Sequence, residues 1–94
     1  NNYLGNVRQW QDLFFNKRKS FTHMLNPDYG KISEGYSIPY VFVEDRKDLK
    51  SAIDKMLSTD GPFLLECAVK EEENVLPMTP PGKSVDEMLL ELDI

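Results

Sequence analysis

The chain of 94 residues contains one cysteine and one histidine, and has no Cys/His or His/His pair at the spacing of metal ligands. This excludes a zinc site of the usual kinds and an internal disulfide framework. A lone cysteine fits the reducing cytosol, so we predict a cytoplasmic protein. Cys67 stands in an apolar run and is expected to be a small buried residue, whereas His23 is expected to be an exposed loop residue.

Basic residues are also scarce. Eleven Lys and Arg against sixteen Asp and Glu give a net charge of −5, which argues against a nucleic-acid partner because phosphate binding needs clustered positive charge. No apolar stretch approaches the roughly 20 residues that cross a bilayer, so no membrane partner is expected. Gly-rich phosphate-binding loops of the GxGxxG or GxxxxGK type are absent as well. With 40% hydrophobic residues, the chain still has the composition of a folded globular protein.

The first segment, from Gly5 to about Asn16, has the periodicity of an amphipathic helix. Its apolar residues recur on one side, and its polar residues fall mostly on the other. The apolar set is Val7, Trp10, Leu13 and Phe14, and the polar set is Arg8, Gln9, Gln11 and Asp12. From the residues alone, Trp10 is either a core residue or the wall of a binding site.

The middle of the chain predicts a βαβ unit, and hence an α/β fold. A short helix capped by Asn26 and ending around Gly35 precedes an apolar strand, 38–43, and a second strand follows at 62–69. Between the strands, apolar residues follow a helical stripe from residue 49 to 57, with a stop at 60–61. We expect parallel strands, each buried on both faces, in a sheet that needs further strands to be stable.

The segment 74–94 is predicted to be a C-terminal arm. Three prolines within residues 75–82 favour an extended, irregular chain. A capping box formed by Ser84 and Glu87 then predicts a short last helix through Leu90.

Several strings of the sequence resemble the catalytic subunits of acetolactate synthase, also called acetohydroxyacid synthase. The N-terminal string NNYLGNVRQWQ, followed by LFF, resembles the family's NNxxLGMVRQWQxLFF segment, and the arm's ENVLPMTPPG resembles the family's tail. The resemblance implies that residues 1–94 are the C-terminal half of the domain that binds thiamine diphosphate. It predicts a piece of a longer chain, because the family's Gly-Asp-Gly motif is missing.

In that family, an Asn side chain and a backbone carbonyl two residues further hold the Mg²⁺ that bridges to the cofactor's diphosphate. The resemblance places these ligands at Asn1 and Tyr3, with Asn2 as the weaker candidate for the side-chain ligand. It extends cofactor binding to Gly5 and Asn6, although Asn6 stands where the family commonly has Met. Without the resemblance, two successive Asn residues before a helix are more often a turn or a helix cap than a metal ligand.

The resemblance further implies that Trp10 lines the substrate pocket and favours 2-oxobutyrate as acceptor. The implied reaction is decarboxylation of pyruvate on thiamine diphosphate, followed by condensation with a second 2-oxo acid in branched-chain amino-acid biosynthesis. No catalytic acid or base is assigned to this chain. FAD is implied elsewhere in the longer protein.

The implied partners are the remainder of the catalytic subunit, its homodimer or tetramer, and a regulatory small subunit. Alone, the chain is expected to be inactive and to self-associate through its exposed strand edges. Two alternatives stay open. One is a non-catalytic α/β interaction module, and the other is a different thiamine-diphosphate carboligase, such as one acting on glyoxylate.

Overall fold

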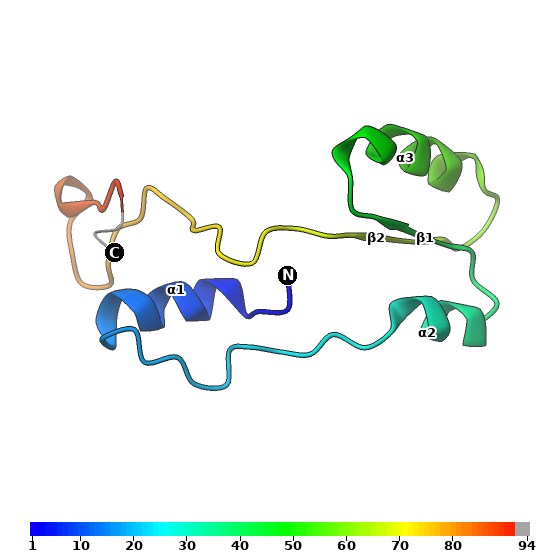
Figure 1. The fold of residues 1–94 in the computed structure, drawn as a ribbon. Helices are drawn as coiled ribbons and strands as arrows, with labels where there is room; N and C mark the ends of the chain where they lie inside the picture. The colour runs from blue at the N-terminus through cyan, green and yellow to red at the C-terminus, as the bar shows by residue number, and fades with distance from the viewer. Residues whose placement is uncertain (92–94) are drawn as a thin grey trace. The chain divides into compact units, whose positions relative to one another are not determined.

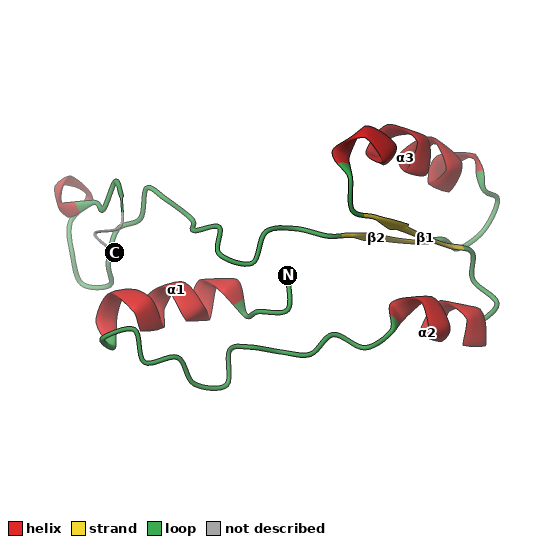
Figure 2. Ribbon diagram, viewed as in Figure 1, coloured by secondary structure: helices red, strands yellow, loops and turns green. Residues whose placement is uncertain are grey.

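The computed structural model describes residues 1–91, which form two compact units. We call Asn1 with Leu25–Lys70 the sheet unit, and Asn2–Met24 with Glu71–Ile94 the arm unit. Two helices come first, and a strand, a helix and a second strand follow, in the order that the α/β prediction requires (Figures 1 and 2). The elements are α1 (Gly5–Phe14), α2 (Tyr29–Gly35), β1 (Tyr40–Val43), η1 (Arg46–Asp48), α3 (Leu49–Ser58), β2 (Leu64–Cys67) and η2 (Val85–Glu87).

The sheet unit contains the predicted βαβ arrangement. β1 and β2 pair in parallel, with Tyr40 opposite Leu64 and Val43 opposite Cys67. In Figure 1, α3 lies on one side of this two-stranded sheet and α2 on the other. The connection from α3 to β2 turns at Gly61, whose φ of +109° lies in a region that favours glycine, as the predicted stop requires.

Burial of the strands is less complete than the sequence predicts. Among the described residues, the buried apolar ones are Val43 and Ala52, whereas Phe42 is 49% exposed. Cys67, expected to be buried, is exposed at the end of β2. The prediction of strands buried on both faces is therefore wrong for the described chain, because two strands and two short helices cannot cover both faces of a parallel sheet.

The start of α2 also differs from the prediction. Its N-cap is Asp28 rather than Asn26, and the Asp28 carboxylate accepts a hydrogen bond of 3.0 Å from the Lys31 N–H. A negative charge at this end complements the helix dipole, which favours Asp28 as the cap. Two residues after this cap, Gly30 lies against the Tyr40 ring, so close that an added Cβ would stand 3.1 Å from Tyr40 Cε1. The predicted end of the helix at Gly35 is confirmed.

The Tyr40 hydroxyl donates a hydrogen bond to the carboxylate of Glu66 on the neighbouring strand. This bond is the main reason why the pKa of Tyr40 is raised to about 12, with burial and the negative charges of Glu66 and Asp28 adding to it. Because the folded-state pKa lies above the ordinary value of 10.0, the stabilisation is fully present below about pH 10. It is lost as the pH rises through about 12.

At alkaline pH, the unfolding free energy should therefore fall less steeply in Tyr40→Phe than in the unaltered chain. The difference in unfolding free energy between the unaltered chain and this variant should shrink as the pH rises from about 10 to about 12. Urea unfolding across this range measures it, with Tyr36→Phe as a control that removes a tyrosine 76% exposed on the same unit. A difference that does not change with pH would contradict the role of the Tyr40–Glu66 bond.

In the arm unit, α1 begins at Gly5 as predicted and ends at Phe14, two residues before the predicted end. Asn16 and Lys17, which follow, both have a positive φ. The predicted last helix is a single 3-10 turn, η2, and does not continue through Leu90. Instead, Met78 and Leu89 exchange two backbone hydrogen bonds of 2.9 and 2.8 Å, which hold residue 89 in an extended bridge. Positions 92–94 of the predicted arm lie outside the described residues.

The orientation of α1 is the largest departure from the sequence analysis. Its buried residues are the polar pair Arg8 and Gln9, which are 3% and 2% exposed. Its apolar residues are half-exposed, with Val7 at 50% and Trp10 at 47%. The helix is amphipathic, as predicted, but within this unit its polar side is the covered one. None of the helices in residues 1–91 has the length and apolar character needed to cross a membrane.

Candidate functional site

The segment that leads into α1 pairs with residues 22–24 in a short antiparallel bridge. The Leu4 N–H donates to the Thr22 carbonyl at 2.8 Å, and the Met24 N–H donates to the Asn2 carbonyl at 2.7 Å. Tyr3 lies opposite His23, and their rings are 4.9 Å apart. Since alternate peptide groups of an extended strand point in opposite directions, the Tyr3 carbonyl is directed away from residues 22–24.

The predicted site residues lie at or near the start of α1. Asn1 is exposed and Tyr3 is partly buried. Gly5 and Asn6 are the first two residues of the helix. No side chain among the described residues caps this end, and its first turn contains no acidic residue, so the positive end of the helix dipole is not compensated there.

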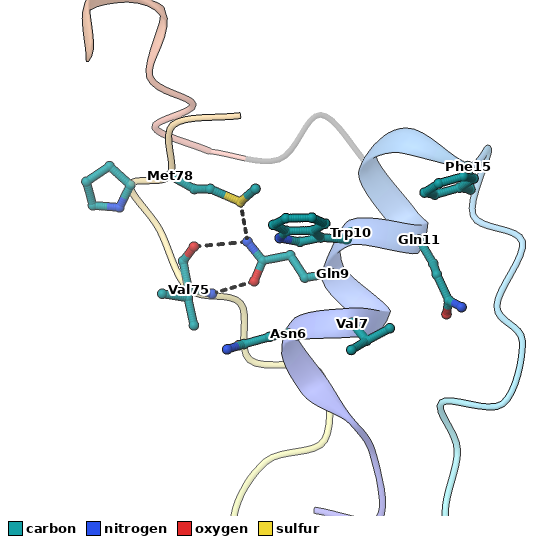
Figure 3. Close-up of a pocket in the computed structure, with 9 residues that line it drawn as sticks. Asn6, Val7, Gln9, Trp10, Gln11, Phe15, Val75 and Met78 are labelled. Atoms are coloured by element: carbon teal, nitrogen blue, oxygen red, sulfur yellow. Dashed lines mark hydrogen bonds between the residues drawn. The ribbon is translucent and has the colours of Figure 1, made fainter. Parts of the chain in front are cut away.

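Trp10 lies on a cavity of about 590 Å³ between α1 and the arm (Figure 3). The walls are largely apolar, with a few amide groups among them. The lining residues are Asn6, Val7, Gln9, Trp10, Gln11, Phe15, Val75, Pro77 and Met78. The structure thus brings together two of the predicted site residues, Asn6 and Trp10, and gives Trp10 the position of a wall rather than of a core residue.

The Trp10 indole is held from one side by an aromatic neighbour. Its ring contacts the Phe14 ring edge to face, with centroids 6.1 Å apart and planes at 82°. Such a pair adds about 0.5–1.5 kcal/mol beyond the area that it buries. The indole therefore presents a defined surface to the cavity.

The arm is fastened to α1 by polar contacts. The Gln9 side chain donates to the Val75 carbonyl at 2.9 Å and accepts from the Val75 N–H at 2.7 Å, as Figure 3 shows. Beside it, the Arg8 guanidinium donates to the Asn74 side chain at 3.1 Å and forms an ion pair with Asp12 at 3.2 Å. Buried polar groups need such partners, so the polar side of α1 stays covered only while the arm is in place.

Sequence reasoning missed the roles of Gln9, Val75 and Met78. The resemblance included all three positions but gave them no function. No local signal marks them, because the two halves of the Gln9–Val75 pair are 66 positions apart. One signal in the sequence could have indicated the role of Gln9. It is a polar residue next to Trp10, in a helix for whose apolar side the sequence shows no packing partner.

Among residues 1–91, no group of three or more His, Cys, Asp or Glu side chains is placed to hold a metal ion. Near the start of α1, neutral oxygens are contributed by amide side chains and by the backbone. Oxygen donors suit Mg²⁺, which prefers six of them and often takes several from phosphate and water. The residues present therefore fit part of a magnesium site that needs further ligands.

Comparison with known proteins defines the class. Residues 1–67 match the family described as thiamine pyrophosphate enzyme, C-terminal TPP binding domain, and the chain belongs to this family. Thiamine pyrophosphate is another name for thiamine diphosphate. This match confirms the α/β prediction and the predicted family of thiamine-diphosphate enzymes.

Within the family, the chain is similar to acetolactate synthases along almost its whole length. It is 43% identical to acetolactate synthase isozyme 2 large subunit of Escherichia coli over 98% of the chain, and 39% identical to chloroplastic acetolactate synthase 1 of Zea mays over 99%. The large subunit of Cyanidium caldarium is 42% identical over 95% of the chain. These matches confirm the resemblance inferred from the sequence, and all three extend beyond residue 67 into the arm.

The chain spans about a sixth of the length of these relatives, with 17%, 16% and 16% of each covered in turn.

Proposed function

We propose that this chain is part of the catalytic subunit of an acetolactate synthase, which joins pyruvate to a second 2-oxo acid on thiamine diphosphate. The observation that carries the proposal is the position of Trp10 on an apolar cavity that the arm lines on one side. In the relatives, the aligned region includes both the helix that bears this residue and the arm. An apolar wall suits the alkyl group of an acceptor 2-oxo acid.

The start of α1 is proposed to face the cofactor's diphosphate. Asn1, through its side chain, and Tyr3, through its carbonyl, are proposed as magnesium ligands, with Gly5 and Asn6 beside the cofactor. The direction of the Tyr3 carbonyl and the uncompensated positive end of the helix support this assignment. The remaining metal ligands and the FAD site are proposed to lie in other parts of the protein.

When bound, thiamine diphosphate supplies the carbanion chemistry of the reaction. The residues described here are proposed to orient the acceptor and to enclose it. Trp10 limits the space for the acceptor's alkyl group, and the arm excludes water from that side of the cavity. No described residue is proposed as a catalytic acid or base.

The remainder of the catalytic subunit is the proposed main partner, together with a homodimer or tetramer of that subunit and a regulatory small subunit. The domain prediction, with residues 1–94 as one part of the cofactor domain and 74–94 as its arm, is retained as part of the proposal. A cytoplasmic location also remains a proposal, and the maize relative is named as chloroplastic.

An exchange of segments tests the proposed function. The region of the E. coli isozyme 2 large subunit that aligns with this chain would be replaced by the chain itself. Purified chimera should form acetolactate from pyruvate when thiamine diphosphate, Mg²⁺ and FAD are supplied. The 94-residue chain alone should form none, because the Gly-Asp-Gly half of the diphosphate site is not in it.

The alternatives give different results in the same experiment. A folded chimera that binds the cofactor and condenses glyoxylate but not pyruvate supports the other carboligase. A folded chimera with no cofactor binding supports the interaction module and contradicts the proposal.

A further inference from the structure

Two glutamines on α1, two positions apart, fasten two different segments to the helix. Gln9 pairs with the backbone of Val75 in the arm. Gln11 pairs in the same manner with Ser20, donating to its carbonyl at 2.9 Å and accepting from its N–H at 3.4 Å. A primary amide can do this because it carries a donor and an acceptor side by side, like a peptide group in a strand.

Gln9 differs from Gln11 because it is more deeply buried and because it holds the arm. Its side chain is 2% exposed, and its amide also lies 3.5 Å from the Met78 sulfur. The Val75 side chain is itself 62% exposed, so the arm is held at this point by its backbone rather than by apolar packing. Immediately after this point, Pro77 and Met78 form the cavity wall across from α1.

We propose that Gln9 is a positioning residue of the substrate cavity. By fixing the peptide of Val75, it sets where Pro77 and Met78 stand relative to Trp10, and so sets the width of the cavity that takes the acceptor's alkyl group. The identity of that ligand rests on the proposed function. The positioning itself does not, because it concerns contacts within this chain.

Trp10 provides a direct readout, since it is the single tryptophan of the chain. In the 94-residue chain, Gln9→Ala should release the arm, shift the Trp10 emission to longer wavelength and raise its quenching by acrylamide. The rise should be about twofold at most, because Trp10 is already 47% exposed with the arm in place. Gln11→Ala is the comparison variant: it removes the same amide from another cavity residue, and should change both quantities less, because Gln11 bonds Ser20 and Thr22 rather than the arm.

A second variant, Gln9→Glu, separates positioning from a general loss of structure. An ionised carboxylate accepts from the Val75 N–H but repels the Val75 carbonyl, whereas a protonated carboxyl group donates to one and accepts from the other, like Gln. Burial raises the pKa of such a carboxyl group. The variant should therefore resemble Gln9→Ala at pH 8 and return toward the unaltered chain as the pH falls to about 5.5, above the pI of about 4.8.

The proposal is overturned if Gln9→Ala leaves emission and quenching unchanged, or if Gln11→Ala changes them equally. Should Gln9→Ala unfold the chain, the Gln9→Glu titration decides, and a variant that does not recover at lower pH overturns the proposal. None of these measurements uses cofactor or 2-oxo acid. An inactive chimera would thus count against the proposed function and leave the positioning role intact.

Discussion

Arg8→Ala is expected to lower the unfolding free energy of this chain by about 3 kcal/mol, near the lower end of the range for breaking a buried ion pair. The guanidinium is 3% exposed and bonds Asp12, the Asn74 side chain and, at 3.5 Å, the Glu73 carbonyl. Its removal leaves the Asp12 carboxylate, which is 10% exposed, with Lys19 at 3.8 Å as the remaining ion pair in the described structure. Because this contact with Lys19 still compensates part of the Asp12 charge, we expect a loss near the lower end of that range.

Urea unfolding followed by Trp10 emission measures this effect, because Arg8 and Trp10 belong to the same unit. Lys83→Ala is the matched control. Lys83 and Glu87 have the same spacing of four residues at 2.9 Å, but their side chains are 54% and 47% exposed. An exposed pair of this kind contributes about 0.3–0.5 kcal/mol. If the unfolding free energy falls by a similar amount in the two variants, the buried contacts of Arg8 do not stabilise the arm unit.

The second large effect concerns the acceptor. In the active chimera, Trp10→Leu is expected to reduce the preference for 2-oxobutyrate over pyruvate as acceptor by about tenfold or more. We propose that the indole surface contacts the extra methylene of 2-oxobutyrate, and one methylene in an apolar pocket is worth about 1–3 kcal/mol of discrimination. The ratio of the two condensation products, formed from a mixture of both acids, measures the preference.

Phe21→Leu is the control for this substitution. It also replaces an aromatic residue of the arm unit by leucine, but Phe21 is 97% exposed and does not line the cavity. It should keep the product ratio of the unaltered chimera. A Trp10→Leu chimera with an unchanged ratio, and with normal cofactor binding, would show that the acceptor is selected elsewhere.

Local sequence patterns were sufficient to predict the helices and strands of the sheet unit. The switch between runs of apolar residues and the helical stripe predicted β1, α3 and β2, since each depends on neighbours close in the chain. The α2 cap was misplaced by two residues, because Asn26 and Asp28 are both good caps and the contact of Gly30 with Tyr40 is not visible in the sequence.

The arm unit was harder to predict for a physical reason. Periodicity shows which residues share a side of a helix, but not which side the rest of the chain will cover. The burial of Arg8 and Gln9 depends on residues 73–75, more than sixty positions away. The same distance hid the cavity, which needs α1 and the arm together, so that only the resemblance pointed to Trp10.

The contact between Gln9 and Val75 joins a side chain to a main chain, so substitutions are restricted differently at the two positions. Residue 9 must keep an amide, whereas residue 75 contributes only the peptide group that nearly every amino acid has. Proline alone would remove the N–H. The side chain at position 75 is thus available to shape the cavity without loosening the arm. If the proposed function holds, acceptor selectivity can change at this position while the arm stays attached to α1.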